Sequence, residues 1–174
     1  MRNITGDLVL RTIADVADAA DIGCVGGWLD IRAEGTSLPA LTSISGGLYI
    51  HAEGASLPAL TSVDGGLNIS AEDTSLPALT SVDGGLNIRA EGASLPALTS
   101  IGGGLDIRAE DTSLPGLGAV LAHSTWSLVK LHASGLYAAG CRGPWSRDQA
   151  LAHWGGRSDE RAVLFSAALR ADTR

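Results

Sequence analysis

The chain repeats one pattern of apolar and polar residues every 19 positions. Five copies start with leucine, at Leu29, Leu48, Leu67, Leu86 and Leu105. The last copy departs from the pattern after Pro115. In each copy the first, third and fifth residues are Leu, Ile and Ala, and mostly polar residues alternate with them. This alternation predicts a short strand with one buried and one outward face.

A second apolar series follows each predicted strand. In the first copy it is Leu38, Leu41 and Ile44, with Pro39 fixing a corner and Gly46-Gly47 closing the copy. The glycine pair is expected to supply left-handed or crowded backbone conformations. One copy cannot bury its apolar face alone, so stacked copies predict a continuous aliphatic column. The fold class is therefore mainly β, a single-chain β-solenoid.

Both ends of such a stack need caps, and the flanking sequence predicts them. We divide the chain into an N-terminal cap with a degenerate first repeat (1–28), a five-copy acidic solenoid (29–123) and a C-terminal cap (124–174). A short helix is expected over 13–21 after Thr12. Strands over 126–132 and 136–139 flank Ser134-Gly135 as a hairpin.

Two helices are predicted to follow this hairpin. Ser146 and Gln149 form a capping-box pattern before a helix over 147–154. Ser158 is expected to cap a helix over 159–171, with one apolar face made of Val163, Leu164, Ala167 and Ala168.

The motif L-x-x-L-x-x-[IV]-x-G-G-L-x-I resembles leucine-rich-repeat-like solenoids, especially the short repeats of receptor-L-type domains. The resemblance covers residues 8–123 and implies a binding architecture. A period as short as 19 residues favours a tight β-helix with little helix.

The residue types that carry catalysis or bind metals are scattered. None of the histidines (His51, His123, His132 and His153) lies at metal-ligand spacing from another ligand, so neither metal nor cofactor is expected. The serines recur every 19 residues, which indicates a structural column, and no enzyme is expected. We expect Cys24 and Cys141 to lie near opposite ends as separate reduced thiols. A column of threonines (Thr42, Thr61, Thr80 and Thr99) is expected to make structural hydrogen bonds rather than to bind ice.

Apolar stretches are too short for a membrane span, and the first residues lack a signal-peptide pattern. A cytoplasmic location without a membrane partner is therefore expected. The net charge of −7 is unevenly distributed: −2 over 1–28, −8 over 29–123 and +3 over 124–174. From Ala33 to Ile88 there is no Lys or Arg.

Glutamate occupies the sixth position of every copy; the five are Glu34, Glu53, Glu72, Glu91 and Glu110. Stacked rungs lie about 4.8 Å apart, which makes this column a ladder of like charges. Arg32, Arg89 and Arg108 are expected to relieve three rungs, whereas His51 and Ser70 stand at that position in the middle copies.

The hypothesis is a non-catalytic protein-binding solenoid whose partner has a basic surface. The residues expected to bind it are Glu34, Glu53, Asp64, Glu72, Asp73, Asp83 and Glu91. Five rungs carry eleven carboxylates, about one per 2.2 Å, against about one charge per 1.7 Å of duplex DNA. This density makes the surface similar in character to DNA-mimicking pentapeptide-repeat proteins.

A DNA-mimicking inhibitor of a nucleic-acid-binding complex, such as a phage anti-CRISPR protein, fits this hypothesis, and direct nucleic-acid binding does not. One alternative is a generic recognition or scaffold module that binds a protein through its strand face or C-terminal cap. Another is an acidic face that only keeps the stack soluble. The oligomeric state is left open.

Overall fold

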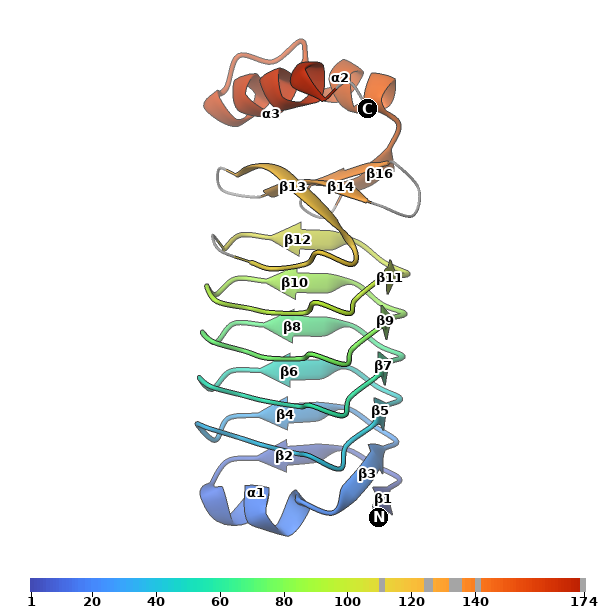
Figure 1. The fold of residues 1–174 in the computed structure, drawn as a ribbon, viewed down its shortest axis with the longest axis vertical. Helices are drawn as coiled ribbons and strands as arrows, with labels where there is room; N and C mark the ends of the chain where they lie inside the picture. Colours follow the sequence, from blue (N-terminus) through green and yellow to red (C-terminus); the bar gives the residue numbers. More distant parts are fainter. Residues whose placement is uncertain (110–111, 124–126, 132–135, 140–141, 173–174) are drawn as a thin grey trace.

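The computed structural model describes residues 1–109, 112–123, 127–131, 136–139 and 142–172. Parallel coils stack into a β-solenoid with helix α1 (Ile13–Ala19) at its N-terminal end (Figure 1). An antiparallel sheet and two helices lie at the other end. The predicted fold class is confirmed, including the 19-residue period and the small helix content of the coils.

Two six-stranded parallel sheets run along the stack. Sheet 1 contains β1 (Arg2–Ile4), β3 (Ile22–Val25), β5 (Ser43–Ile44), β7 (Ser62–Val63), β9 (Ser81–Val82) and β11 (Ser100–Ile101). Sheet 2 contains β2 (Leu8–Leu10), β4 (Leu29–Ile31), β6 (Leu48–Ile50), β8 (Leu67–Ile69), β10 (Leu86–Ile88) and β12 (Leu105–Ile107). From β4 to β12 each residue of sheet 2 pairs with the residue 19 positions later.

Isolated bridges between serines form a third ladder, which links Ser37, Ser56, Ser75, Ser94 and Ser113. The predicted serine column is therefore structural. After it, Leu41 N–H donates to the Leu38 carbonyl at 3.3 Å and closes a turn with Pro39 at its second position. Proline suits that position because its φ is already fixed at the value the turn needs.

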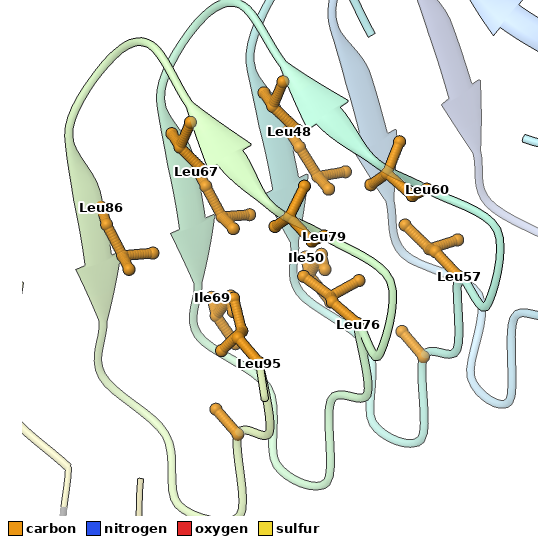
Figure 2. Packing of buried hydrophobic residues seen from close by; sticks show 14 of the residues in the cluster. Leu48, Ile50, Leu57, Leu60, Leu67, Ile69, Leu76, Leu79, Leu86 and Leu95 are labelled. Atoms are coloured by element: carbon orange, nitrogen blue, oxygen red, sulfur yellow. The ribbon is translucent and has the colours of Figure 1, made fainter. Parts of the chain in front are cut away.

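Aliphatic side chains fill the space between the three ladders. Leu48, Ile50, Leu57 and Leu60 of one coil lie against Leu67, Ile69, Leu76 and Leu79 of the next (Figure 2). All eight are at most 1% exposed, which confirms the predicted inward positions. Burying a leucine or isoleucine contributes about 2 kcal/mol, so each coil depends on its neighbours for stability.

The glycine pairs are required by crowding. A Cβ built on the first glycine of a pair meets the backbone of the preceding rung at 2.6 Å in Gly46, Gly65 and Gly84. The described glycines with positive φ are instead Gly35, Gly54 and Gly92, at a different corner. The pairs therefore allow close stacking of the coils and do not supply a left-handed turn.

The N-terminal helix begins as predicted. Thr12 is the N-cap of α1, and its hydroxyl and the Asp15 carboxylate form a reciprocal capping box. Backbone hydrogen bonds from Arg11 and Thr12 lower the pKa of Asp15. The helix ends at Ala19, two residues before the predicted end.

A four-stranded antiparallel sheet covers the C-terminal end of the solenoid. Its strands are β13 (Gly118–His123), β14 (Ser127–Leu131), β15 (Tyr137–Ala139) and β16 (Arg142–Trp145). The predicted strands over 126–132 and 136–139 correspond to β14 and β15, which pair antiparallel; Trp126, His132 and Ser134-Gly135 lie outside the described residues. Val129 and Ala138 join the solenoid core, whereas Leu128 and Tyr137 pack toward the helices.

Helix α2 (Arg147–Trp154) has the predicted Ser146–Gln149 capping box. Helix α3 (Glu160–Ala171) differs from the prediction. Its N-cap is Asp159, not Ser158, and the Asp159 carboxylate accepts from Ala162 N–H at 3.1 Å. This hydrogen bond lowers the pKa of Asp159.

The buried face of α3 is also different. Ala162, Phe165, Ser166 and Leu169 are buried, whereas Val163 is 57% and Leu164 39% exposed. Phe165 packs edge-on against Trp154 of α2, and this aromatic contact decides which face turns inward.

Cys24 is a free thiol, and its expected counterpart Cys141 lies outside the described residues. Within the described part of the chain, no helix is long and apolar enough to cross a membrane.

Substituting Gly65 by alanine is expected to lower the free energy of unfolding by about 2 kcal/mol, because its Cβ would lie 2.6 Å from the Gly46 carbonyl carbon. Gly66→Ala is the matched control, since its closest contact is 3.3 Å. Urea unfolding measures both variants. Equal losses would contradict the crowding explanation.

Asp159→Ala is expected to lower the midpoint of urea unfolding, and Ser158→Ala to leave it unchanged. Because the pKa of Asp159 is lowered in the folded state, its stabilising effect is complete near neutral pH. It is lost as the pH falls through that lowered pKa. A larger effect of Ser158→Ala than of Asp159→Ala would show that Ser158 is the N-cap, as the sequence predicted.

Candidate functional site

The seven carboxylates predicted to bind a partner lie at two different corners of the coil. Five follow the strands of sheet 2, at the corner before the serine ladder; they are Glu34, Glu53, Glu72, Asp73 and Glu91, and we name them the acidic edge. Asp64 and Asp83 lie at the corner between sheet 1 and sheet 2. All seven are exposed. Glu110, the last rung of the ladder, lies outside the described residues.

Backbone hydrogen bonds hold the glutamates of the acidic edge in register. Gly35 N–H donates to the Glu53 carbonyl at 2.9 Å, and Gly54 N–H donates to the Glu72 carbonyl at 3.2 Å. Asp73 N–H donates to the Glu91 carbonyl at 3.2 Å in the same way. The glutamates are therefore stacked at the rung spacing of about 4.8 Å.

The acidic edge is unpaired. Across the described ranges, none of its carboxylates accepts a hydrogen bond or forms an ion pair. Arg32 binds Asp30 instead, with Nη2 2.7 Å from Oδ2, and Arg89 donates to Asn87. The expectation that Arg32 and Arg89 relieve the glutamate ladder is wrong, because each pairs with the side chain that shares its outward strand face, whereas the glutamate follows at the corner. The rung expected for Arg108, Glu110, lies outside the described residues. Arg108 pairs with Asp106 at 2.9 Å.

Asp73 has an unusual backbone conformation. Its φ is +54°, at the position where Gly35, Gly54 and Gly92 also have positive φ. A side chain in this left-handed region costs about 1 kcal/mol relative to glycine, although aspartate tolerates it better than most residues. The third copy therefore adds a second carboxylate to the edge at a cost in backbone energy.

The outer face of sheet 2 contains a buried charge that alternation did not predict. Asp30 points outward from β4, yet its side chain is only 7% exposed. Arg32 covers one side and donates to Oδ2 through Nε at 2.9 Å as well as through Nη2. This hydrogen bond and the charge of Asp30 raise the pKa of Arg32. The other oxygen, Oδ1, is buried and has no hydrogen-bond partner.

His51 connects this carboxylate to the next coil. Its Nε2 lies 3.9 Å from Asp30 Oδ1, and its Nδ1 lies 2.9 Å from Ser70 Oγ. The residue types are those of a hydrolytic triad, but 3.9 Å exceeds a hydrogen bond. Ser70 Oγ also donates to the Ile50 carbonyl at 3.1 Å. These contacts orient His51 without forming a continuous proton relay.

Two open depressions, each of about 350 Å³, lie on this face and share Tyr49. The first is lined by Trp28, Asp30, Arg32, Tyr49 and His51. The second runs along the glycine corner; its polar lining residues are Asn68, Asn87 and Asp106. Trp28 and Tyr49 meet edge to face, with ring centroids 6.4 Å apart, and are 38% and 41% exposed.

Sequence reasoning missed this face, although the copies contain a signal for it. They are almost identical at inward positions, but they differ at the two outward positions of the sheet 2 strand, and also at the seventeenth position at the glycine corner. These positions hold Asp30, Tyr49, Asn68, Asn87 and Asp106, and then Arg32, His51, Ser70, Arg89 and Arg108. Exposure alone does not explain this variation, because the exposed glutamates do not vary.

The threonine column is structural, as predicted. Thr61 Oγ1 donates to the Thr42 carbonyl at 3.0 Å, and Thr80 and Thr99 repeat this contact at 3.0 and 3.3 Å. No group of three or more metal-ligating side chains occurs among the residues with described positions.

Asp73→Gly is expected to raise the free energy of unfolding by about 1 kcal/mol, because glycine removes the strain of the left-handed backbone. Asp64→Gly removes the same charge at a position without positive φ, where the fourth copy has Gly102. It is expected to leave the free energy of unfolding unchanged. Urea unfolding of both variants tests this. Equal stabilisation would assign the effect to charge instead of backbone strain.

The chain was compared with protein-family models, curated proteins and solved structures. It matches none of them.

Proposed function

We propose that this protein is a non-catalytic binding module whose acidic edge contacts a basic protein surface. The main support is the glutamate at the sixth position of all five copies. Buried leucines and stacked glycines recur because packing requires them. The described glutamate side chains make no hydrogen bond or ion pair, so the fold gives no reason for their recurrence.

Electrostatics makes this recurrence costly. Carboxylates one rung apart repel by about 1 kcal/mol in water, and by several times more near a protein surface of lower effective dielectric. Solubility needs net charge, but it does not need like charges stacked in one column. A basic partner would relieve this repulsion on binding, and its approach would be steered by the same field.

The spacing of the charges supports a finer proposal about the partner. Five carboxylates over four rungs give about one charge per 3.8 Å, close to the roughly 3.4 Å between phosphates of one DNA strand. A protein surface that binds phosphates is therefore a suitable partner. A DNA-mimicking inhibitor, such as a phage anti-CRISPR protein, is the specific form of this proposal, and the same charges would repel nucleic acid itself.

Glu53→Lys combined with Glu72→Lys is expected to abolish retention of basic proteins from a host lysate at about 0.15 M salt, where charges are screened over roughly 8 Å. The free energy of unfolding is expected to stay equal or rise, because the pair interrupts a like-charge ladder. Quantitative mass spectrometry of the retained proteins and urea unfolding measure the two effects.

Asp64→Lys with Asp83→Lys is the matched control, since it changes the charge equally at the other corner. We expect it to keep most of the binding. Duplex DNA is expected to compete with the acidic edge for the retained basic proteins. Raising the salt concentration is expected to release these proteins. Unchanged retention by the Glu53/Glu72 variant would exclude the acidic edge as the contact.

A further inference from the structure

The depression around Asp30 has the features of a built binding site, independent of the acidic edge. The Asp30 side chain is more than nine-tenths buried, lines the depression and leaves Oδ1 without a hydrogen-bond partner. A buried carboxylate oxygen without a donor costs free energy, which a ligand donor would recover. Two partly exposed aromatic rings, Trp28 and Tyr49, border the same depression.

The charge of this face argues against an ionic ligand. Asp30 is neutralised by Arg32, and Asp106 by Arg108. Arg89 donates to an uncharged partner, the Asn87 amide. The outward positions of the sheet 2 strands thus carry a net charge of only +1, far below the charge that binding an anionic or cationic polymer requires. The face offers fixed pairs of one donor group and one acceptor group in the first, fourth and fifth copies.

We propose that the outer face of sheet 2 binds a neutral saccharide chain, with its main subsite between Trp28, Asp30, Arg32 and Tyr49. A pyranose ring has an apolar C–H face, which packs against aromatic rings, and a rim of hydroxyls that each donate and accept. One hydroxyl donates to Asp30 Oδ1, and a neighbouring hydroxyl accepts from the Arg32 guanidinium. The paired side chains are already held in place, which reduces the entropy lost on binding.

The second depression extends the site. It begins at Tyr49 and continues past Asn68 and Asn87 to Asp106. The rungs from Asp30 to Asp106 span about 19 Å, enough for a chain of a few sugar units. The glycine corner leaves the groove open, because Gly66, Gly85 and Gly104 have no side chains there.

His51 lines the same depression, next to the buried oxygen. Its ring nitrogen Nε2 lies 3.9 Å from Oδ1, and its side chain is 43% exposed. The proposed hydroxyl contact with Oδ1 requires this ring to turn away from Asp30.

The experiment is an array of neutral glycans probed with the labelled full chain, followed by calorimetric titration of the best-bound glycan. We expect the glycan affinity to stay unchanged when the salt concentration is raised about tenfold, from about 0.05 to about 0.5 M, because no net charge is neutralised on binding. Failure to bind any neutral glycan would overturn the proposal. So would binding restricted to glycans with amino, carboxylate or phosphate groups.

Substitutions taken from other copies test the subsite with little risk to the fold. Tyr49→Asn and Asp30→Asn introduce the asparagine that other copies have at the same repeat position, Asn68 and Asn87. Trp28→Gly introduces the glycine that precedes the strand in the next copy, Gly47. Each is expected to weaken glycan binding at least tenfold with a cooperative unfolding transition retained. Binding that survives all three would overturn the proposal.

Glu53→Gln combined with Glu72→Gln is the control at the acidic edge. It is expected to leave glycan affinity unchanged while weakening retention of basic proteins, so the two proposals fail or hold separately. Loss of glycan binding in this control would place the sugar on the edge and contradict the assignment to sheet 2.

Discussion

From β4 to β12 the backbone hydrogen bonds between coils place each residue on its counterpart 19 positions away. This constraint produces the aliphatic column, the crowded glycines, the serine bridges and the threonine contacts. It also forces every outward residue to stack on its own kind where the copies agree. A stabilising contact between stacked side chains therefore recurs in each coil, and so does a repulsive one. The glutamate column and the leucine column therefore have the same geometric origin, although one repels itself and the other packs.

Periodicity was sufficient to predict most of the solenoid, because inward and outward positions follow from alternation within a strand and repetition between strands. The sequence also predicted two helix starts, at Thr12 and at Ser146. The second rested on a capping-box motif, which is a short-range signal. The start of α3 was missed because serine and aspartate stand side by side at 158 and 159, and both residue types cap well. The inward face of that helix depends on Phe165 meeting Trp154, a tertiary contact that a helical pattern does not contain.

The candidate sites were predictable to different degrees. The position of each acidic corner followed from the repeat, but the partners of Arg32 and Arg89 did not. Each arginine pairs with the nearest carboxylate or amide. That group is the side chain two positions earlier on the same strand, not the glutamate at the following corner. Asp30 was unpredictable for a related reason. Its burial comes from the side chains of two neighbouring rungs, which a single copy does not specify.

The near identity of the copies has a consequence for how such a molecule can change over generations. Units of 19 codons that differ at few positions are substrates for unequal recombination, which removes or inserts whole units. Because each coil contacts only its neighbours, a gain or loss of one unit shifts the C-terminal sheet along the axis and leaves both caps intact. Each such event lengthens or shortens the array of charges by about 4.8 Å, one rung. The length of the acidic edge can thus vary in discrete steps without any new fold being required.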